Sequence, residues 1–221
     1  QLILRAGGHY VWSRGEELMT DRFPELARAR DFIPDGTVID GEVLVWGEDG
    51  PQPFNALQRR IGRKTVPKKL LAETPIILCA YDLLEWQGVD IRQEPLQLRR
   101  ATLENLCQTL PKDAPVKLSP AVPFDTWATL ADLRKTARDK AAEGLMLKRR
   151  ASPYLTGRKK GDWWKWKLDP LTIDAVMIYA QSGSGRRANL FTDFTFAVWK
   201  GPPENGELVP FTKAYSGLTD A

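Results

Sequence analysis

Residues 163–170 read WWKWKLDP, and this stretch separates two parts of the chain that differ in character. Read as a strand, it places Trp164 and Trp166 on one face and Lys165 and Lys167 on the other, and its proline ends the element. On this segment alone we favour an amphipathic strand with a solvated face. The alternative is a rigid cationic platform for a phosphate.

The part before this stretch mixes strands and helices. Strands are expected at residues 2–5, 10–13, 37–46, 76–86, 143–149 and 163–167, the first two joined by a hairpin turn at Gly7 and Gly8. Helices are expected at residues 24–30, 54–61 and 96–110, and from an N-cap at Asp125 to about Ala141. Because the elements do not follow a strict βα alternation, the expected fold class is α+β.

The part after this stretch reads as a small antiparallel β unit. Strands expected at residues 172–180, 189–200 and 208–214 are separated by Gly/Ser or Gly/Pro turns, with no helical pattern between them. We therefore expect two domains, residues 1–169 and 170–221. Three strands are too few for a closed barrel, so we expect further strands downstream.

The composition is that of an ordinary globular protein, and it excludes several kinds of site. Hydrophobic residues make up 43% of the 221 residues, and no apolar run reaches the roughly 18 residues of a membrane helix. Cys79 and Cys107 are expected to be buried free thiols in a reducing compartment. Since His9 is the only histidine, His-based triads and multi-histidine metal sites are excluded. Any metal would be held by oxygens, which suits Mg²⁺ or Mn²⁺.

Basic residues are concentrated in two segments. Residues 134–168 contain twelve Lys and Arg against three acids, and residues 59–69 contain six and no acid. The whole chain carries only +4, so the remainder is net acidic. This segregation is typical of a surface that binds a polyanion, with nucleic acid as the first candidate. Two solvated basic faces are the alternative.

Four short stretches place charged or aromatic residues in apolar surroundings. They are residues 40–42 (DGE), 81–84 (YDLL), 143–148 (EGLMLK) and 165–167 (KWK). Asp40 and Glu42 would incur a desolvation cost unless they had partners. In an ideal strand Glu143 and Lys148 point to opposite faces, so they share a site only if the strand twists, bulges or ends between them. Each stretch alone can be explained structurally: Asp40 and Glu42 as edge-strand charges, Tyr81 as a core aromatic residue, and Glu143 as an acid at a helix end. These explanations do not account for the occurrence of all four stretches together.

The order of these four stretches resembles the nucleotidyltransferase motifs of ATP-dependent DNA ligases, especially the bacterial ones. Two further segments extend the resemblance: WSRGEELMTDRFPEL at residues 12–26 and GRRANLFTDFTFAVW at residues 185–199, which is similar to the start of the family's OB domain. The resemblance implies an ATP-grasp-like nucleotidyltransferase (adenylation) domain with antiparallel sheets and flanking helices at residues 1–169. It implies a partial OB-fold domain at residues 170–221.

The resemblance also implies a reaction and its residues. A lysine attacks the α-phosphate of ATP, AMP passes to the 5′-phosphate of a nick, and the 3′-hydroxyl displaces AMP. The catalytic residues would be Lys165 and Lys167, on a strand fixed by Trp164 and Trp166. The cofactor-binding residues would be Arg14, Glu42 at the ribose, Tyr81 stacked on the adenine, and Lys148, Lys165 and Lys167 at the phosphates. Mg²⁺ or Mn²⁺ would be bound by Glu42 and Glu143. Nicked duplex DNA would be held by Ser13, Arg14, Arg59, Arg60, Arg63, Lys64, Arg158, Lys159 and Lys160.

The sequence departs from the family pattern at the nucleophile. The family lysine lies in a KxDG motif ahead of the first strand, and no KxDG occurs here; residues 38–41 read VIDG. We therefore expect an internal fragment that does not form the enzyme-adenylate by itself. The family implies a cytoplasmic, bacterial, monomeric protein that does not bind membranes. An RNA ligase, a GTP-using capping enzyme and a degenerate nucleic-acid-binding module remain alternatives.

Overall fold

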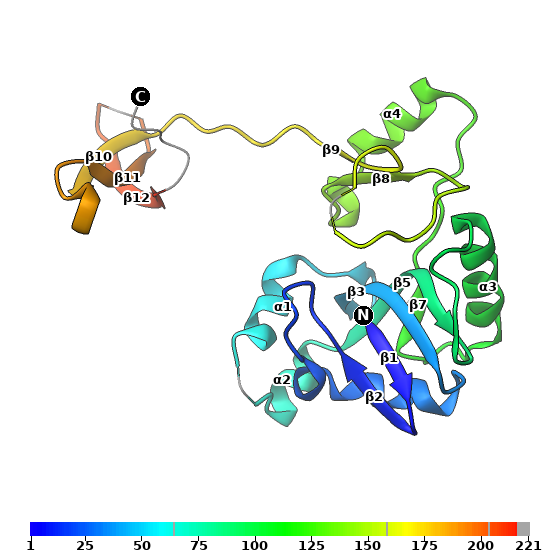
Figure 1. The fold of residues 1–221 in the computed structure, drawn as a ribbon. Helices are drawn as coiled ribbons and strands as arrows, with labels where there is room; N and C mark the ends of the chain where they lie inside the picture. The colour runs from blue at the N-terminus through cyan, green and yellow to red at the C-terminus, as the bar shows by residue number, and fades with distance from the viewer. Residues whose placement is uncertain (64, 158, 203, 216–221) are drawn as a thin grey trace. The chain divides into compact units, whose positions relative to one another are not determined.

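The computed structural model describes residues 1–63, 65–157, 159–202 and 204–215 and contains two compact units, Gln1–Leu168 and Asp169–Ala221 (Figure 1). The first unit combines helices with two sheets, and the second contains a third sheet. The fold is therefore mixed α+β, as expected. None of the helices in the described ranges is long and apolar enough to cross a membrane.

The largest sheet of the first unit has seven strands. They are β1 (Leu2–Arg5), β2 (Gly8–Val11), β3 (Thr37–Gly47), β4 (Gly50–Pro51), β5 (Ile76–Trp86), β6 (Val89–Asp90) and β7 (Val116–Leu118). The main path runs β2-β1-β3-β5-β6, β4 pairs with β3, and β7 pairs with β5. All pairs are antiparallel except β5 with β7. The β1–β2 turn lies at Ala6 and Gly7, both with positive φ, rather than at Gly7 and Gly8 as expected.

Three α-helices and two 3₁₀ segments accompany the large sheet. They are η1 (Thr20–Arg22), η2 (Pro24–Asp31), α1 (Phe54–Ile61), α2 (Lys68–Glu73) and α3 (Leu96–Thr109). Helix α3 lies beside β5 and β7 (Figure 1). The core joins Leu4, Ile39 and Leu78 of the strands to Leu26 of η2 and Leu103 of α3, all at most 1% exposed. Each such side chain contributes roughly 1.5–3 kcal/mol through its burial.

A separate hairpin forms the second sheet of this unit. Strands β8 (Gly144–Lys148) and β9 (Trp163–Lys167) pair antiparallel, and α4 (Trp127–Lys135) packs on them. The N-cap of α4 is Thr126 rather than Asp125, because the Thr126 hydroxyl accepts from the Thr129 N–H in a capping box. The helix is also shorter than expected: it ends at Lys135, and a separate 3₁₀ turn, η3 (Arg138–Lys140), follows.

The second unit is a three-stranded antiparallel sheet within the described residues. Its strands are β10 (Val176–Ser182), β11 (Phe191–Lys200) and β12 (Glu207–Ala214), in the order β10-β11-β12. A 3₁₀ turn, η4 (Gly185–Arg187), connects the first two strands. All three expected strands are present, although β10 and β11 begin later than expected.

Candidate active site

Strands β3 and β5 bring the DGE and YDLL stretches together. Asp40 pairs with Asp82 and Glu42 with Cys79, so these four residues share one face of the sheet. The register skips Tyr81 between the Asp40–Asp82 and Gly41–Ala80 pairs, which makes Tyr81 the extra residue of a β-bulge. The Asp40 and Asp82 carboxylates and the Tyr81 ring therefore lie close together on the sheet.

The Asp82 carboxylate is fully buried and paired with a fully buried arginine of α3. Arg99 donates from Nε to Oδ1 at 2.8 Å and from Nη2 to Oδ2 at 3.0 Å. The Leu83 N–H donates to Oδ1 at 2.9 Å. Arg99 also donates to the Ser152 carbonyl at 3.0 Å. A bidentate pair of this kind compensates the desolvation of both charges.

Lys148, at the end of β8, reaches this carboxylate from the hairpin. Its Nζ lies 3.7 Å from Asp82 Oδ2, 4.7 Å from the centroid of the Tyr81 ring and 4.0 Å from that of the Trp163 ring. The side chain is 14% exposed. Burial lowers the pKa of Lys148, and the charges of Asp82 and Asp40 oppose this shift. Cation–π contacts compensate part of the lost hydration.

Replacement of Lys148 by methionine is expected to stabilise the protein at neutral pH by on the order of 1 kcal/mol, because Asp82 keeps Arg99 and no buried ammonium remains. The folded-state pKa of Lys148 is lowered, so the parent loses stability as pH falls from the ordinary lysine pKa of 10.5 through the folded value. The advantage of the variant should therefore disappear above that ordinary value. Urea unfolding of both proteins at neutral pH and above pH 10.5 measures this; a less stable variant at neutral pH would contradict it.

Further contacts fix the hairpin against the large sheet. The Tyr154 hydroxyl donates to Asp40 Oδ2 at 2.8 Å, and Trp163 Nε1 donates to Ser152 Oγ at 2.9 Å. The Tyr154 and Trp163 rings meet edge to face, with centroids 5.3 Å apart. Burial raises the pKa of Asp40, and the Tyr154 hydrogen bond and the Lys148 charge partly offset this. Asp40 thus has the partners that its position in an apolar strand required.

The register of β8 and β9 collects the three motif lysines on one face. Lys148 pairs with Trp163, Met146 with Lys165, and Gly144 with Lys167. Because paired residues and residues two apart share a face, Lys148, Lys165 and Lys167 point the same way. Gly144 has a φ of +148°, and a Cβ there would collide with the backbone of β9. Glycine is required at this position for the two strands to pair.

Glu143 lies just outside β8 and turns toward the same lysines. Its Oε2 is 2.7 Å from Lys167 Nζ, and both side chains are exposed. The hydrogen bond from Lys167 lowers the pKa of Glu143, with smaller contributions from the charges of Lys167 and Lys165. Because the strand begins after Glu143, the alternation that would separate it from Lys148 does not apply. The EGLMLK stretch therefore places a carboxylate and a lysine beside the same cationic face.

The opposite face of the hairpin is anchored mainly through Trp166. Its ring contacts Trp127 of α4 edge to face at 6.4 Å, and the Arg134 guanidinium lies 4.9 Å from its centroid. Trp164 is 48% exposed, so the expectation that it fixes the strand is wrong. The fixing tryptophans are Trp166 on one face and Trp163 on the lysine face.

Comparison with known proteins assigns the chain to a family. The family model described as "ATP dependent DNA ligase domain" matches residues 1–167. The chain belongs to the ATP-dependent DNA ligase family. A probable DNA ligase of Opitutus terrae is 35% identical over 100% of this chain and 24% of its own length. A probable DNA ligase of Koribacter versatilis is 32% identical over 95% of this chain and 39% of its own length. The chain thus spans well under half of these relatives.

A solved structure agrees with the family assignment. The structure described as mycobacterial DNA ligase D complexed with ATP and MES superimposes with a TM-score of 0.61 at 25% identity. The match covers 99% of this chain and 63% of that chain. This likeness supports the mixed α+β fold and the assignment to an ATP-dependent ligase family.

The structure separates the ligase-motif residues into those that cluster and those that do not. Tyr81 and Lys148 are in contact, and Lys165 and Lys167 share the Lys148 face. Glu42 is exposed on the Asp40 face of β3. Ser13 and Arg14 follow β2: Ser13 Oγ accepts from the Glu17 N–H at 3.1 Å, and the Arg14 side chain is exposed. No hydrogen bond or ion pair among the described residues joins this pair to the lysines.

The basic residues expected to hold DNA divide into two groups. Arg59, Arg63, Lys159 and Lys160 are exposed. Lys64 and Arg158 lie outside the described residues. Arg60 is 0% exposed, and its guanidinium pairs with Glu25 at 2.7 Å and donates to two backbone carbonyls. The expectation that Arg60 contacts the DNA backbone is therefore wrong, because no part of its side chain reaches the surface.

Three residues of this site were missed in the sequence, namely Arg99, Tyr154 and Trp163. Arg99 could have been found, because it lies on the apolar stripe of α3 with Leu96, Leu103 and Leu106, where an arginine needs a buried acid. Asp82 within the apolar run of β5 is the matching acid. Tyr154 and Trp163 give no such signal, since an aromatic residue fits many ordinary core positions.

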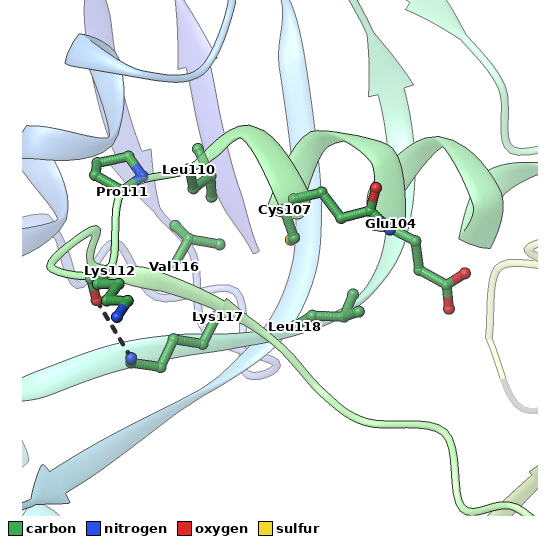
Figure 2. Close-up of a pocket in the computed structure, with 9 residues that line it drawn as sticks. Glu104, Cys107, Leu110, Pro111, Lys112, Val116, Lys117 and Leu118 are labelled. Carbon is green, nitrogen blue, oxygen red and sulfur yellow. Dashed lines mark hydrogen bonds between the residues drawn. The ribbon is translucent and has the colours of Figure 1, made fainter.

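A pocket of about 270 Å³ lies elsewhere, between the end of α3 and β7 (Figure 2). Cys107 and Leu110 line it from one side and Val116 and Leu118 from the other, and Lys117 donates to the Lys112 carbonyl at its edge. Its lining contains none of the motif residues. Cys107 and Cys79 are free thiols as expected, although half-buried rather than fully buried. Burial raises the pKa of Cys107 to about 11, which makes it a poor nucleophile.

Proposed function

We propose that this protein is the adenylation part of an enzyme that seals nicks in duplex DNA through enzyme-adenylate and DNA-adenylate intermediates. The observation that carries this proposal is the shared face of Lys148, Lys165 and Lys167, which adjoins Tyr81 and Glu143. Transfer of a nucleotidyl group needs fixed positive charge where negative charge develops on phosphate. A paired strand supplies such charge with little reorganisation.

Each motif residue has a role in this proposal. Lys165 and Lys167 contact the phosphate that is transferred and stabilise its transition state. Tyr81 stacks on the adenine, Glu42 contacts the ribose, and Lys148 contacts the phosphates. Met146 lies on the lysine face and is 48% exposed, so apolar surface is also available there. Residues 1–169 form the ATP-grasp-like adenylation domain, and residues 170–221 form the start of an OB-fold domain.

A magnesium ion fits this site only with help from the substrate. No group of three or more His, Cys, Asp or Glu side chains that could hold a metal occurs among the described residues. Glu143 supplies an exposed carboxylate beside the lysine face, and Glu42 is exposed on β3. Mg²⁺ is commonly held by one or two carboxylates together with water and phosphate oxygens, which agrees with this arrangement. When bound, the ion would offset phosphate charge.

The nucleophile of the proposed first step is a lysine outside these 221 residues. The sequence contains no KxDG motif. We therefore expect this chain alone not to form the enzyme-adenylate.

The test is the intact mass of two samples after incubation with Mg²⁺ and ATP or GTP. One sample is this chain, and the other extends the chain upstream far enough to include the proposed KxDG lysine. An AMP adduct on the extended sample alone supports the proposal. An adduct on neither folded sample contradicts it, and a GMP adduct indicates capping chemistry.

Nicked DNA is the proposed second substrate, bound by a monomer. Ser13 and Arg14 would grip the 5′-phosphate, where an arginine fork matches the phosphate oxygens. Of the two roles that the resemblance implies for Arg14, we propose the one at DNA and not the one at ATP. Arg59, Arg63, Lys159 and Lys160 would contact the duplex backbone, which positions DNA without reading its sequence.

Replacement of Arg14 by alanine, in the extended sample, is expected to leave self-adenylation unchanged and to slow AMP transfer to nicked DNA by about 100-fold. The Arg14 side chain is exposed, so the fold should not change. Single-turnover assays of the two steps measure the difference. Arg5→Ala is the control, since Arg5 is an exposed arginine already paired with Glu85. Loss of self-adenylation in the Arg14 variant would contradict the assigned role.

A further inference from the structure

Arg99 binds the Asp82 carboxylate, which Lys148 would otherwise bind. Both oxygens of Asp82 accept from Arg99, and Oδ1 also accepts from the Leu83 N–H. Arg99 is itself held by the carbonyls of Glu94 and Ser152. The guanidinium therefore cannot leave Asp82 without breaking several buried hydrogen bonds.

Lys148 is consequently attracted to Asp82 without being bonded to it. Its Nζ is 3.7 Å from Oδ2, and no atom of the described residues forms a hydrogen bond with it. The charges that act on it are Asp82, Asp40, Arg99 and Arg100, with the Tyr81 and Trp163 rings on its sides. The donors of Lys148 Nζ are therefore unused among the described residues.

The position of Lys148 also covers one face of Tyr81. A base that stacks on this face has to displace the ammonium, and a phosphate nearby would accept its unused donors. Because the ammonium gives up only cation–π contacts and a 3.7 Å ion pair, its displacement costs less than breaking a direct salt bridge.

We propose that Arg99 is a positioning residue for nucleotide binding: it saturates Asp82, so that Lys148 stays free to move from Tyr81 to the phosphates of ATP. This inference rests on the proposed function, because it assigns the nucleotide to the Tyr81 face. Arg99 touches neither the nucleotide nor the reacting atoms and acts through Lys148.

Replacement of Arg99 by lysine distinguishes the positioning role from a purely structural role. Arg99→Lys keeps a buried cation beside Asp82, but a single ammonium cannot reproduce the fork that engages both oxygens. Asp82 Oδ2 then becomes available, and Lys148 closes the remaining distance to form a charge-assisted hydrogen bond. The captured Lys148 remains over Tyr81 and competes with the nucleotide.

The experiment measures ATP affinity in the extended sample for a double-mutant cycle of Arg99→Lys and Lys148→Met. We expect Arg99→Lys alone to weaken ATP binding about tenfold, the size of one hydrogen bond to a charged group. In the Lys148→Met background the same change should have almost no effect, because no ammonium is left to capture. Arg100→Lys, the next residue of α3, pairs with Glu104 and not with Asp82, and should bind ATP as the parent does.

Two results would overturn the inference: an unchanged affinity in Arg99→Lys, or an equal loss in both backgrounds, as a structural role predicts. If Arg99→Lys does not fold, the pair Arg99→Gln with Asp82→Asn replaces it. That pair should bind ATP as the parent does, since the Asp82 carboxylate that would capture Lys148 is gone, and a tenfold loss would overturn the inference. A parent that binds no ATP would instead contradict the proposed function, and the inference with it.

Discussion

Alanine at Lys165 or Lys167 is expected to lower the rate of AMP transfer by about 100-fold or more in the extended sample. In other enzymes, removal of one preorganised hydrogen-bond donor to a developing negative charge lowers the rate by roughly 10²–10³-fold. Both side chains are exposed on the lysine face of β9, so neither substitution removes core packing. The unfolding midpoint should therefore equal that of the parent, while single-turnover adenylation and nick sealing both fall.

Lys135→Ala is the matched control for these variants. Lys135 is an exposed lysine of the adjacent helix α4, and it pairs with Asp132 on the same helix. Its replacement removes the same charge from the same unit but not from the lysine face, and sealing should continue at the parental rate. Parental rates in both the Lys165 and Lys167 variants would refute the role of the cationic strand.

Alanine at Arg60 is expected to destabilise the first unit by about 3 kcal/mol, because it removes a fully buried guanidinium and leaves the buried Thr74 carbonyl and the partly buried Glu25 carboxylate without their donor. Arg60 pairs with both oxygens of Glu25 and donates to the carbonyls of Arg22 and Thr74. It therefore joins η2 and the end of η1 to α1 and the end of α2. Urea unfolding measures the loss.

Arg59, the residue before Arg60, provides a control that has the same charge but is exposed. Arg59 pairs with Glu73 on the surface, with 58% and 38% of the two side chains exposed. Arg59→Ala should change the free energy of unfolding by less than about 1 kcal/mol. Equal stability of the two variants would contradict the structural role of Arg60. Weaker DNA binding by Arg59→Ala alone would agree with the proposed backbone contact.

The sequence by itself determined the fold class and the motifs, because these depend on local patterns. A segment rich in β-branched residues predicted β3, and a mostly apolar run predicted β5. The leucines at positions 96, 103, 106 and 110 predicted α3, and the loss of helical pattern after Pro170 predicted a separate β unit. The order of the four motifs predicted the ligase family, which the family match confirms. Helix ends were predicted less well. The N-terminus of α4 is capped by the Thr126 hydroxyl, although the adjacent Asp125 is also a favoured type of N-cap residue.

Only the tertiary structure decided which charges are buried and what they bind. Arg59 and Arg60 are adjacent and chemically identical in the sequence, yet one is solvated and the other fully enclosed, because successive residues of a helix face different directions. Arg99, Asp82 and Lys148 lie far apart in the sequence, and their contact exists because α3, β5 and β8 meet in space. Local patterns do not contain such long-range pairings, since burial of a charge depends on the partner that the fold supplies.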